Sequence, residues 1–331
     1  MAWLYAWLAR RAHNKGLAQC QALPVPVIVV GNVLVGGTGK TPVVAAIVAH
    51  LQAAGMRPGI VARGYKAAAA SNGGASQPTL VHTSSLATDC GDEPKLLFEL
   101  TQVPVCVHRQ RLLAAQHLLA QHPEINVIVS DDGLQHVALP RDIEVVVFDE
   151  RATGNGQLLP AGLLREPWPR AAAQQQAAHC LVLQNGVDAP TVATANPTSP
   201  VFVSLRALGE LQPLLPNGVC CQAPATGDTV QILAGIAKPQ AFAAMLRRQG
   251  FVVTHTAQVT DHDALDGAWP ASFGLDPRLP TICTAKDAVK LRARADAAQL
   301  NMWVAPLSVA LPTAFWVAFD QCLATIQPQS A

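Results

Sequence analysis

The sequence predicts an α/β protein with a mainly parallel sheet, joined to a second, smaller α/β domain. Short runs rich in valine and isoleucine alternate with helix-forming segments over most of the 331 residues, as in βαβ units. A glycine-rich turn follows the first such run, at residues 31–41. Residues 184–229 lose this periodicity and are rich in Pro, Asn, Thr and Gln, so we place the domain junction within them.

Composition excludes several classes of function. The net charge is +1 and no basic run or aromatic ladder is present, so nothing indicates nucleic-acid binding. Half of the residues are hydrophobic, yet no uninterrupted apolar run approaches the roughly 20 residues of a membrane-spanning helix. The eight cysteines form no C-x-x-C pair and no zinc spacing, which favours reduced thiols in the cytosol. The N-terminus has no basic segment before its apolar part and does not resemble a secretory signal.

The N-terminal segment, residues 1–16, carries two tryptophans and a tyrosine, followed by three lysine or arginine residues. Trp3 and Trp7 are four residues apart, as are Leu4 and Leu8, so each pair shares a face if the segment is helical. Aromatic rings with neighbouring cations suit the headgroup layer of a membrane. We therefore expect Trp3, Leu4 and Trp7 to contact a membrane. A short helix packed on the protein's own core is the alternative.

The strongest motif follows the apolar run at residues 24–30. Its candidate nucleotide-binding residues are Gly36, Gly37, Thr38, Gly39, Lys40 and Thr41. Glycines let successive backbone N–H groups surround phosphate oxygens, and the helix expected at residues 43–54 adds its dipole. Lys40 would reach the β- and γ-phosphates, and the Thr41 hydroxyl would ligate Mg²⁺. One position departs from the usual G-x-x-x-x-G-K-[ST] spacing, because Leu34 stands where the first glycine is expected. A glycine-rich turn without a ligand is the alternative.

A second strand is expected at residues 57–65, where it ends in an Arg-Gly-Tyr turn. Asp92 and Glu93 then precede a helix, and from the residues alone Asp92 is best explained as a helix cap. A strand at residues 103–107 and a helix containing Arg111 follow.

The second strong motif ends the apolar run at residues 125–130 and reads Asp131-Asp132-Gly133-Leu134-Gln135-His136. Phosphate-loop enzymes place an acid there to hold Mg²⁺, directly or through water. A solvated Asp-Gly turn is the alternative. Because ligands bind at the carboxyl ends of parallel strands, Lys40, Asp92 and the two aspartates can gather on one edge. A strand at 143–149 follows, and then a Gly/Pro-containing connection at 154–167 that carries an Arg-Glu pair and could cross the cleft.

A new α/β unit begins after the junction. Its expected elements are a strand at 230–234, a helix at 240–249, strands at 251–256 and 281–284, a helix from 286, a strand at 302–309 and a helix at 312–326. His262 lies between two aspartates in a loop of this unit. A surface, capping or core position explains it, and so does an imidazole oriented by a carboxylate for function.

Several of these motifs, taken together and in order, resemble the tetraacyldisaccharide 4′-kinases of lipid A biosynthesis. They are residues 32–42, Arg63-Gly64-Tyr65, Gly91-Asp92-Glu93-Pro94, residues 131–136, Leu159-Pro160-Ala161-Gly162, Arg165-Glu166-Pro167, Gly235-Ile236-Ala237 with Pro239, and Asp261-His262. The matches extend from the glycine-rich loop to about residue 290. The Asp-Asp-Gly-Leu-Gln-His motif beside this particular loop is highly specific, and the aromatic N-terminal segment resembles the family's membrane-associated helix.

The resemblance implies an ATP- and Mg²⁺-dependent kinase, peripheral (monotopic) at the cytoplasmic side of the Gram-negative inner membrane. Its acceptor would be an acylated glucosamine disaccharide 1-phosphate, phosphorylated at the 4′-hydroxyl to give lipid IVA. No nucleic acid and no protein partner are implied. The fold would be of the P-loop NTPase type, with the active site between two α/β/α domains. We expect a membrane-associated helix at 1–16, a kinase core at 17–205 and a second α/β domain at 206–331, whose final helix could pack back on the core.

By the same resemblance Asp92 is the general base and His262 is its partner. A sugar hydroxyl is too weak an acid to ionise at neutral pH, so a placed base must take its proton. The implied metal ligands are Thr41, Asp131, Asp132 and Glu166, and the implied supporting residues are Gln135, His136, Arg165 and Arg111. The segment before His262 departs from the family pattern, because Val259 and Thr260 stand where aromatic or proline residues are expected.

Two other classes of protein compete with this interpretation. A membrane-recruited switch ATPase has a similar loop, but it usually carries a lysine just before the double glycine, where this chain has Val35. A different small-molecule kinase or ligase could use the same Asp92, but it would have no need of an aromatic membrane segment. Loss of liposome binding on deletion of residues 1–16 would count against that third interpretation.

Overall fold

The computed structural model describes residues 7, 11, 13–64, 77–170, 176–193, 200–218, 222–260, 263 and 265–326. The chain divides into two compact units, which are described separately. The first comprises Met1–Thr83, Leu97–Leu205 and Val309–Ala331, and the second comprises Ser84–Leu96 and Arg206–Ser308. The domain boundaries expected from the sequence stay predictions, because compactness alone does not define an independently folding domain.

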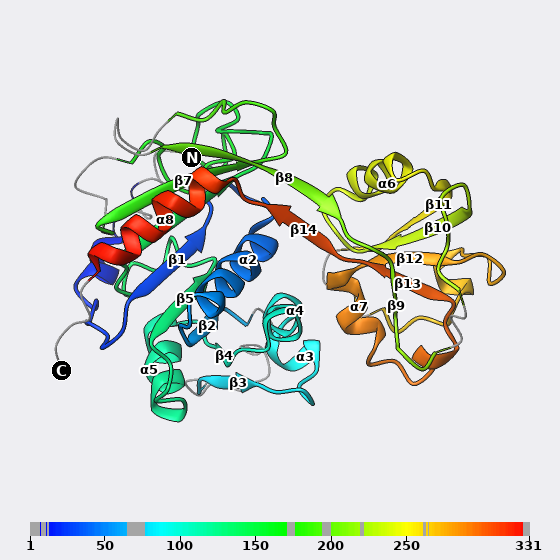
Figure 1. Ribbon diagram of the computed structural model, residues 1–331, viewed down its shortest axis with the longest axis horizontal. Helices are drawn as coiled ribbons and strands as arrows, with labels where there is room; N and C mark the ends of the chain where they lie inside the picture. The colour runs from blue at the N-terminus through cyan, green and yellow to red at the C-terminus, as the bar shows by residue number, and fades with distance from the viewer. Residues whose placement is uncertain are drawn as a thin grey trace. The chain divides into compact units, whose positions relative to one another are not determined.

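The larger sheet has nine strands in the order β14-β8-β7-β6-β1-β5-β2-β4-β3 (Figure 1). The strands are β1 Val27–Gly31, β2 Pro58–Ala62, β3 Thr79–Val81, β4 Val105–Val107, β5 Val127–Asp131, β6 Ile143–Phe148, β7 His179–Asn185, β8 Val201–Leu208 and β14 Leu307–Ala310. β3 is antiparallel to β4, and the pairings from β4 through β2, β5, β1, β6 and β7 to β8 are all parallel. The predicted α/β class with a mainly parallel sheet is confirmed.

Strand β1 lies at the centre of this sheet, between β5 and β6, and all five of its residues are buried. Its apolar composition therefore reflects helices on both faces of the sheet. Val30 of β1 pairs in register with Asp131 of β5. The loops that follow these two parallel strands consequently leave the sheet at the same edge, where open α/β sheets bind their ligands.

The helices are α2 Lys40–Ala53, α3 Ala87–Cys90, α4 Asp92–Thr101, α5 Arg111–Gln121, α6 Pro239–Arg248, α7 Ala285–Leu291 and α8 Thr313–Thr325, with 3₁₀ turns at Ala271–Phe273 and Ala297–Gln299. Helix α2 packs beside β1 and β5 (Figure 1). Its buried residues include Val44, Ile47, Val48 and Leu51, whose spacing of three and four places them on one face. The strongest sequence motif thus forms a strand, a loop and a helix, as predicted.

The smaller sheet has the order β11-β10-β12-β13-β9. Its strands are β9 Gln212–Pro213, β10 Thr229–Ala234, β11 Val252–Gln258, β12 Thr281–Thr284 and β13 Met302–Ala305, all parallel except β9. Ile232 of β10 joins the apolar cluster of α6, whereas its neighbour Leu233 joins that of α7. Because successive side chains of a strand point to opposite faces, α6 and α7 cover opposite faces of this sheet.

One expectation about the elements is wrong. Residues 302–309 do not form one strand. Strand β13 ends before Pro306, and the chain continues as β14 in the larger sheet. Proline lacks the N–H that a continuing ladder requires. Residues 184–229, where the sequence loses its periodicity, include β8, whose exposed and buried residues alternate only in part.

The N-terminal segment is described only in part. Trp7 and Arg11 are helical, and Trp3 and Leu4 lie outside the described residues. Among the residues that the structure describes, no helix is long and apolar enough to cross a bilayer.

Candidate functional site

The glycine-rich loop runs from the end of β1 to the start of α2. Gly39 immediately precedes α2 with φ 79° and ψ 37°, and Gly36 has φ 90°, both in the left-handed region that favours glycine. A Cβ atom added to Gly37 would meet nothing within 4 Å, so the loop borders open space there. Helix α2 therefore begins with N–H groups available to an anion.

Leu34 occupies the position where the common motif has its first glycine. The side chain is fully buried, and its backbone forms an isolated β-bridge with Leu164. Val35 N–H also donates to Leu163 O at 2.9 Å. The departure from the motif therefore has a packing reason, because this part of the loop is paired with the segment that carries Arg165 and Glu166.

Lys40 is held by two side chains. Its Nζ lies 3.2 Å from Asn32 Oδ1 and 3.2 Å from Asp132 Oδ1. Asn32 Nδ2 also donates to Gly36 O at 3.2 Å. Asn32 thus ties the lysine to the loop, which fixes a cation at the N-terminal end of α2.

Asp132 is the acidic centre of this site. It follows β5 with φ 49°, a conformation that non-glycine residues seldom adopt and that is found preferentially at functional positions. Arg165 Nη1 donates to both oxygens of Asp132, at 3.3 Å to Oδ2 and 3.4 Å to Oδ1, and Lys40 Nζ lies 3.2 Å from Oδ1. Burial raises the pKa of Asp132, but the charges of Lys40 and Arg165 outweigh it, so the pKa lies below its ordinary value. The carboxylate is therefore ionised at neutral pH.

Gln135 connects Asp132 and its partners to Glu166. Arg165 Nη1 donates to Gln135 Oε1 at 3.3 Å, and Gln135 Nε2 donates to Glu166 Oε1 at 2.7 Å. Gln135 Nε2 also lies 3.1 Å from the carbonyl oxygen of Asn32. Five residues predicted for this site are thus brought together: Lys40, Asp132, Gln135, Arg165 and Glu166.

Glu166 is held in place by a buried arginine, Arg170. Arg170 Nε and Nη2 donate to the two Glu166 oxygens at 3.0 and 3.1 Å, a bidentate pairing that fixes the plane of the carboxylate. Arg170 Nη1 reaches Glu144 Oε2 at 2.5 Å, and Arg141 Nη1 reaches Glu144 Oε1 at 2.9 Å. Burial lowers the pKa of Arg170, but Glu144 and Glu166 outweigh it and raise the pKa. We call Arg141, Glu144 and Arg170 the buried ion-pair group.

Sequence reasoning missed Asn32, Arg170 and Glu144. Only Glu144 had a signal, since a glutamate inside the apolar run Ile-Glu-Val-Val-Val requires a buried partner.

The remaining predicted residues of the first unit have supporting positions. The Asp131 carbonyl accepts from Arg111 Nη2 at 3.4 Å, and the Arg111 guanidinium also donates to His108 O. Burial lowers the pKa of Arg111 to about 10, so its guanidinium is still charged at neutral pH.

His136 is neutral. Burial, together with the nearby charges of Arg111 and Arg63, lowers the pKa of its imidazole to about 3. Thr41 is partly exposed.

Thr38 is fully buried and anchors the loop from inside. Its carbonyl accepts from Asn185 Nδ2 at 3.0 Å, and Asn185 Oδ1 in turn accepts from the Ser204 hydroxyl. The loop is therefore bound to the end of β7 through Asn185, which Ser204 of β8 holds in turn, and this preorganises the loop for a ligand.

The predicted general base belongs to the second unit. Asp92 is the first residue of α4 and is almost fully buried, and Lys290 Nζ of α7 lies 3.4 Å from its Oδ2. Its expected partner His262, with Asp261, lies outside the described residues. Lys290 and the nearby Asp287 were not singled out in the sequence, because nothing in a Lys-Asp-Ala-Val-Lys helix indicates contact with a residue nearly 200 positions earlier.

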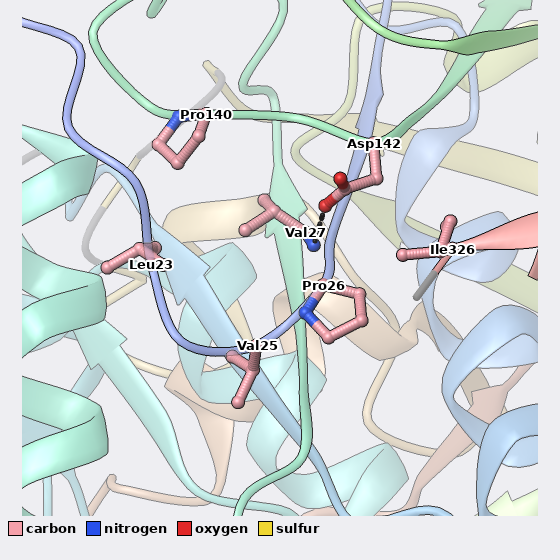
Figure 2. A pocket seen from close by; sticks show the side chains of 7 residues that line it. All are labelled: Leu23, Val25, Pro26, Val27, Pro140, Asp142 and Ile326. Atoms are coloured by element: carbon pink, nitrogen blue, oxygen red, sulfur yellow. Dashed lines mark hydrogen bonds between the residues drawn. The ribbon is translucent and has the colours of Figure 1, made fainter. Parts of the chain in front are cut away.

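The described residues contain no group of three or more His, Cys, Asp or Glu side chains arranged around a common point. A small cavity of about 30 Å³ lies at the opposite end of β1, lined by Leu23, Val25, Pro26, Val27, Pro140, Asp142 and Ile326 (Figure 2). Val27 N–H donates to Asp142 Oδ2 at 2.7 Å beside it. A cavity of this size holds about one water molecule, so it is not a nucleotide site.

Comparison with known proteins gives a consistent result. Residues 1–324 match the family model described as tetraacyldisaccharide-1-P 4′-kinase. A tetraacyldisaccharide 4′-kinase of Polaromonas sp. (strain JS666) is 41% identical over 324 residues, covering 97% of this chain and 89% of the relative. The enzyme of the same name from Acidovorax sp. (strain JS42) is 42% identical over 324 residues, covering 96% and 87%.

A solved structure shares the fold. The crystal structure of LpxK from Aquifex aeolicus in complex with ATP has a TM-score of 0.75 and 24% identity, covering 98% of this chain and 96% of that one. The predicted fold class is confirmed by this match.

Proposed function

This chain belongs to the tetraacyldisaccharide-1-P 4′-kinase family, and on that premise we propose that it transfers the γ-phosphate of ATP to the 4′-hydroxyl of a tetraacyldisaccharide 1-phosphate. The product is lipid IVA, an intermediate of lipid A biosynthesis. The observation that carries the proposal is the convergence of Lys40, Asp132 and Arg165 beside the N-terminal end of α2. Cations and helix N–H groups there match the charge of a triphosphate.

The loop residues would bind ATP through their backbone. Positive φ at Gly36 and Gly39 directs the chain around an anion, and Lys40 supplies the charge for the β- and γ-phosphates. Arg165, which lies 3.3 Å from Asp132 beside the loop, would stabilise charge on the transferred group through its guanidinium. Arg111 and His136 support the end of β5 and the turn after it, and a direct phosphate contact of Arg111 stays a prediction.

The acids near the loop fit Mg²⁺. Asp132, Asp131 and Glu166 offer carboxylate oxygens and Thr41 offers a hydroxyl, which are the hard oxygen ligands that Mg²⁺ prefers. Mg²⁺ in kinases is typically held by one or two carboxylates together with substrate phosphates and water, so a complete protein cage is not required. When bound, the ion would neutralise charge on the β- and γ-phosphates. Asp132 is already ionised, so no proton has to leave it first.

Asp92 is the proposed general base. The oxygen of the 4′-hydroxyl forms a bond to the γ-phosphorus, the bond from that phosphorus to the bridging oxygen breaks, and ADP leaves. The hydroxyl proton passes to the Asp92 carboxylate, which later releases it to water. His262 is proposed to orient Asp92 or tune its basicity.

The N-terminal segment is proposed to hold the enzyme on the cytoplasmic side of the inner membrane. Trp7 is 48% exposed, and the Arg11 guanidinium lies 5.6 Å from the centre of its ring. An exposed tryptophan with an adjacent cation suits the interfacial layer, where the lipid acceptor is found. Trp3 and Leu4 would extend the same face.

The test is incubation of purified protein with Mg-ATP and the tetraacyldisaccharide 1-phosphate in detergent micelles. Mass spectrometry should show a product heavier by one phosphate, and phosphorus–proton correlation by NMR should place it on the 4′-oxygen. Lys40→Met is the negative control, because it retains the acceptor site and removes the loop cation. Unmodified lipid, with ATP hydrolysed only when liposomes or a protein partner are added, would replace the kinase with a switch ATPase.

A further inference from the structure

One end of the buried ion-pair group holds the turn at residues 133–136. Arg141 Nη1 donates to the carbonyl oxygen of Leu134 at 3.0 Å, and Arg141 Nη2 donates to that of His136 at 2.8 Å. The same Nη1 also donates to Glu144 Oε1 at 2.9 Å. Arg141 therefore fixes the backbone of this turn and ties it to the buried acid of the group.

The other end of the group holds Glu166. Arg170 Nη1 donates to Glu144 Oε2, while Nε and Nη2 of the same guanidinium donate to the two Glu166 oxygens. Gln135 Nε2, from the turn that Arg141 holds, donates to Glu166 Oε1 at 2.7 Å. The hydrogen bonds thus close a ring, and both of the groups that hold the Glu166 carboxylate are fixed by the same buried network.

These contacts leave one acceptor position on the Glu166 carboxylate. Each carboxylate oxygen can accept about two hydrogen bonds. Oε1 accepts from both Gln135 Nε2 and Arg170 Nη2, whereas in the part of the chain that the structure describes Oε2 accepts from Arg170 Nε alone. A ligand that joins Glu166 without displacing Gln135 or Arg170 therefore binds through Oε2.

The two acids that Arg170 joins differ in their access to water. The Glu144 side chain is 2% exposed, and its two oxygens accept from Arg141 and Arg170. The Glu166 side chain is 22% exposed, so an incoming ligand can reach it. Arg170 therefore connects an inner acid that is compensated within the protein to an outer acid that remains accessible.

We propose that Arg170 is a positioning residue for Glu166: it fixes the carboxylate beside the turn after Asp132 and leaves Oε2 as the atom that meets the Mg²⁺ of Mg-ATP. The inference rests on the proposed function, in which Mg²⁺ accompanies the nucleotide and Glu166 is one of its ligands. Loss of a side chain that orients a metal ligand typically weakens metal binding by about 10- to 100-fold. Arginine suits this role better than lysine, because its planar fork holds a carboxylate at two points.

The test measures how much Mg²⁺ strengthens ATP binding. Calorimetry gives the dissociation constant of ATP in Mg²⁺ and in EDTA, and the ratio of the two constants is the gain due to the metal. In Arg170→Lys this gain should fall by about tenfold or more, while ATP binding in EDTA should keep its wild-type value. Lysine retains a positive charge beside Glu144, so the variant should fold, which circular dichroism checks.

Arg294 supplies the matched control. It holds Asp296 by the same two-point contact, from Nε to Oδ1 at 2.7 Å and from Nη2 to Oδ2 at 2.8 Å, in the second unit. Arg294→Lys should keep the wild-type gain from Mg²⁺.

A double variant tests whether Arg170 acts through Glu166. Glu166→Gln alone should lower the gain from Mg²⁺, because the amide is a poorer metal ligand than the carboxylate. Adding Arg170→Lys to Glu166→Gln should lower the gain no further, since two residues that act through one contact are not additive.

Three results would overturn the proposal. One is an unchanged gain from Mg²⁺ in folded Arg170→Lys. Another is an equal weakening of ATP binding in Mg²⁺ and in EDTA, which would make Arg170 a requirement of the loop's structure alone. The third is a further loss of the gain when Arg170→Lys is added to Glu166→Gln.

A second variant decides the matter if Arg170→Lys does not fold. Glu166→Asp keeps the acid but shortens its side chain by one methylene group, so it cannot keep the contacts to Gln135 and Arg170 in place. It should also lose most of the gain from Mg²⁺, and a wild-type gain in Glu166→Asp would overturn the proposal. A wild-type enzyme that binds ATP equally well in Mg²⁺ and in EDTA would instead overturn the premise, and this inference with it.

Discussion

The two units contain two different kinds of charged cluster. In the first unit, Asp132 is about 29% exposed and shared between Lys40 and Arg165, while neighbouring Gln135 and Glu166 extend the network toward solvent. In the second unit, Asp92, Lys290 and Asp287 are almost fully removed from water. In the first cluster one carboxylate is shared by two partly exposed cations, whereas the second cluster is closed to water.

The difference indicates what each cluster is suited to do. Partly exposed ion pairs are weaker than fully buried ones, so an incoming triphosphate and its metal could take over their partners. A buried pair is costly to separate, so it is poorly suited to ligand exchange. We therefore propose nucleotide binding for the first cluster and proton transfer at Asp92 for the second.

The largest effect is expected at Asp92. Asp92→Asn should lower kcat by about 10² to 10⁴-fold, because general-base catalysis contributes that much and the amide cannot accept the proton. Product formation is followed by mass spectrometry with the 4′-hydroxyl acceptor. Glu93→Gln, a change in the adjacent exposed acid, should keep near-normal turnover. Equal losses in the two variants would mean that the buried cluster has no special role.

Lys40 should show the next largest effect. Lys40→Met should lower kcat/KM by about 10² to 10³-fold, the usual result of removing one fixed donor to a developing charge. Its neighbour Asn32 should matter less, because it holds the lysine and does not carry the charge itself. Steady-state kinetics with ATP varied would check both. A Lys40→Met enzyme with normal kcat/KM would contradict the proposal that the cluster around Lys40 and Asp132 binds the nucleotide.

The buried ion-pair group should matter for stability. Arg170→Met should lower the free energy of unfolding by about 3 to 5 kcal/mol, since it leaves Glu144 partly uncompensated away from water. Denaturant unfolding followed by circular dichroism measures this. The exposed pair Arg278–Asp276 supplies the control, and Arg278→Met should leave the midpoint in place. Equal shifts in the two variants would contradict the burial argument.

His136 should give the smallest effect, through pH. Its pKa is about 3 in the folded protein and about 6.5 in an unfolded chain. Between these values the unfolded chain binds a proton that the folded protein does not, so stability falls as pH falls from about 6.5 toward 3. In His136→Gln the thermal midpoint should therefore drop less between pH 7 and pH 5 than in the wild type. Identical drops would show that this imidazole is not kept neutral.

Much of the first unit could be predicted because its signals are local in sequence. The run before Gly31, the glycines and Lys40 occupy one continuous stretch, and the Asp131-Asp132 motif marks the adjacent strand end. The parallel pairing of β1 with β5 then brings the two stretches to one edge, as expected. Leu34 shows what the motif alone could not predict. A leucine stands in place of the glycine because this part of the loop pairs with Leu164, which is distant in the sequence.

The second cluster could not be predicted, because its members are far apart in the chain. Asp92 alone looks like a helix cap, and Lys290 alone looks like a solvated helix charge. Only the packing of α4 against α7 removes both from water and makes them partners. Pro306 alone could have predicted the end of β13, but the apolar residues on both sides of it predicted a single strand.

The most direct test of the division between the clusters is the dissociation constant of Mg-ATP, measured by calorimetry for wild type, Lys40→Met and Asp92→Asn. We predict that Asp92→Asn binds Mg-ATP as tightly as wild type while it fails to form product, and that Lys40→Met binds it much more weakly. Loss of Mg-ATP binding in Asp92→Asn, or normal binding in Lys40→Met, would contradict the account.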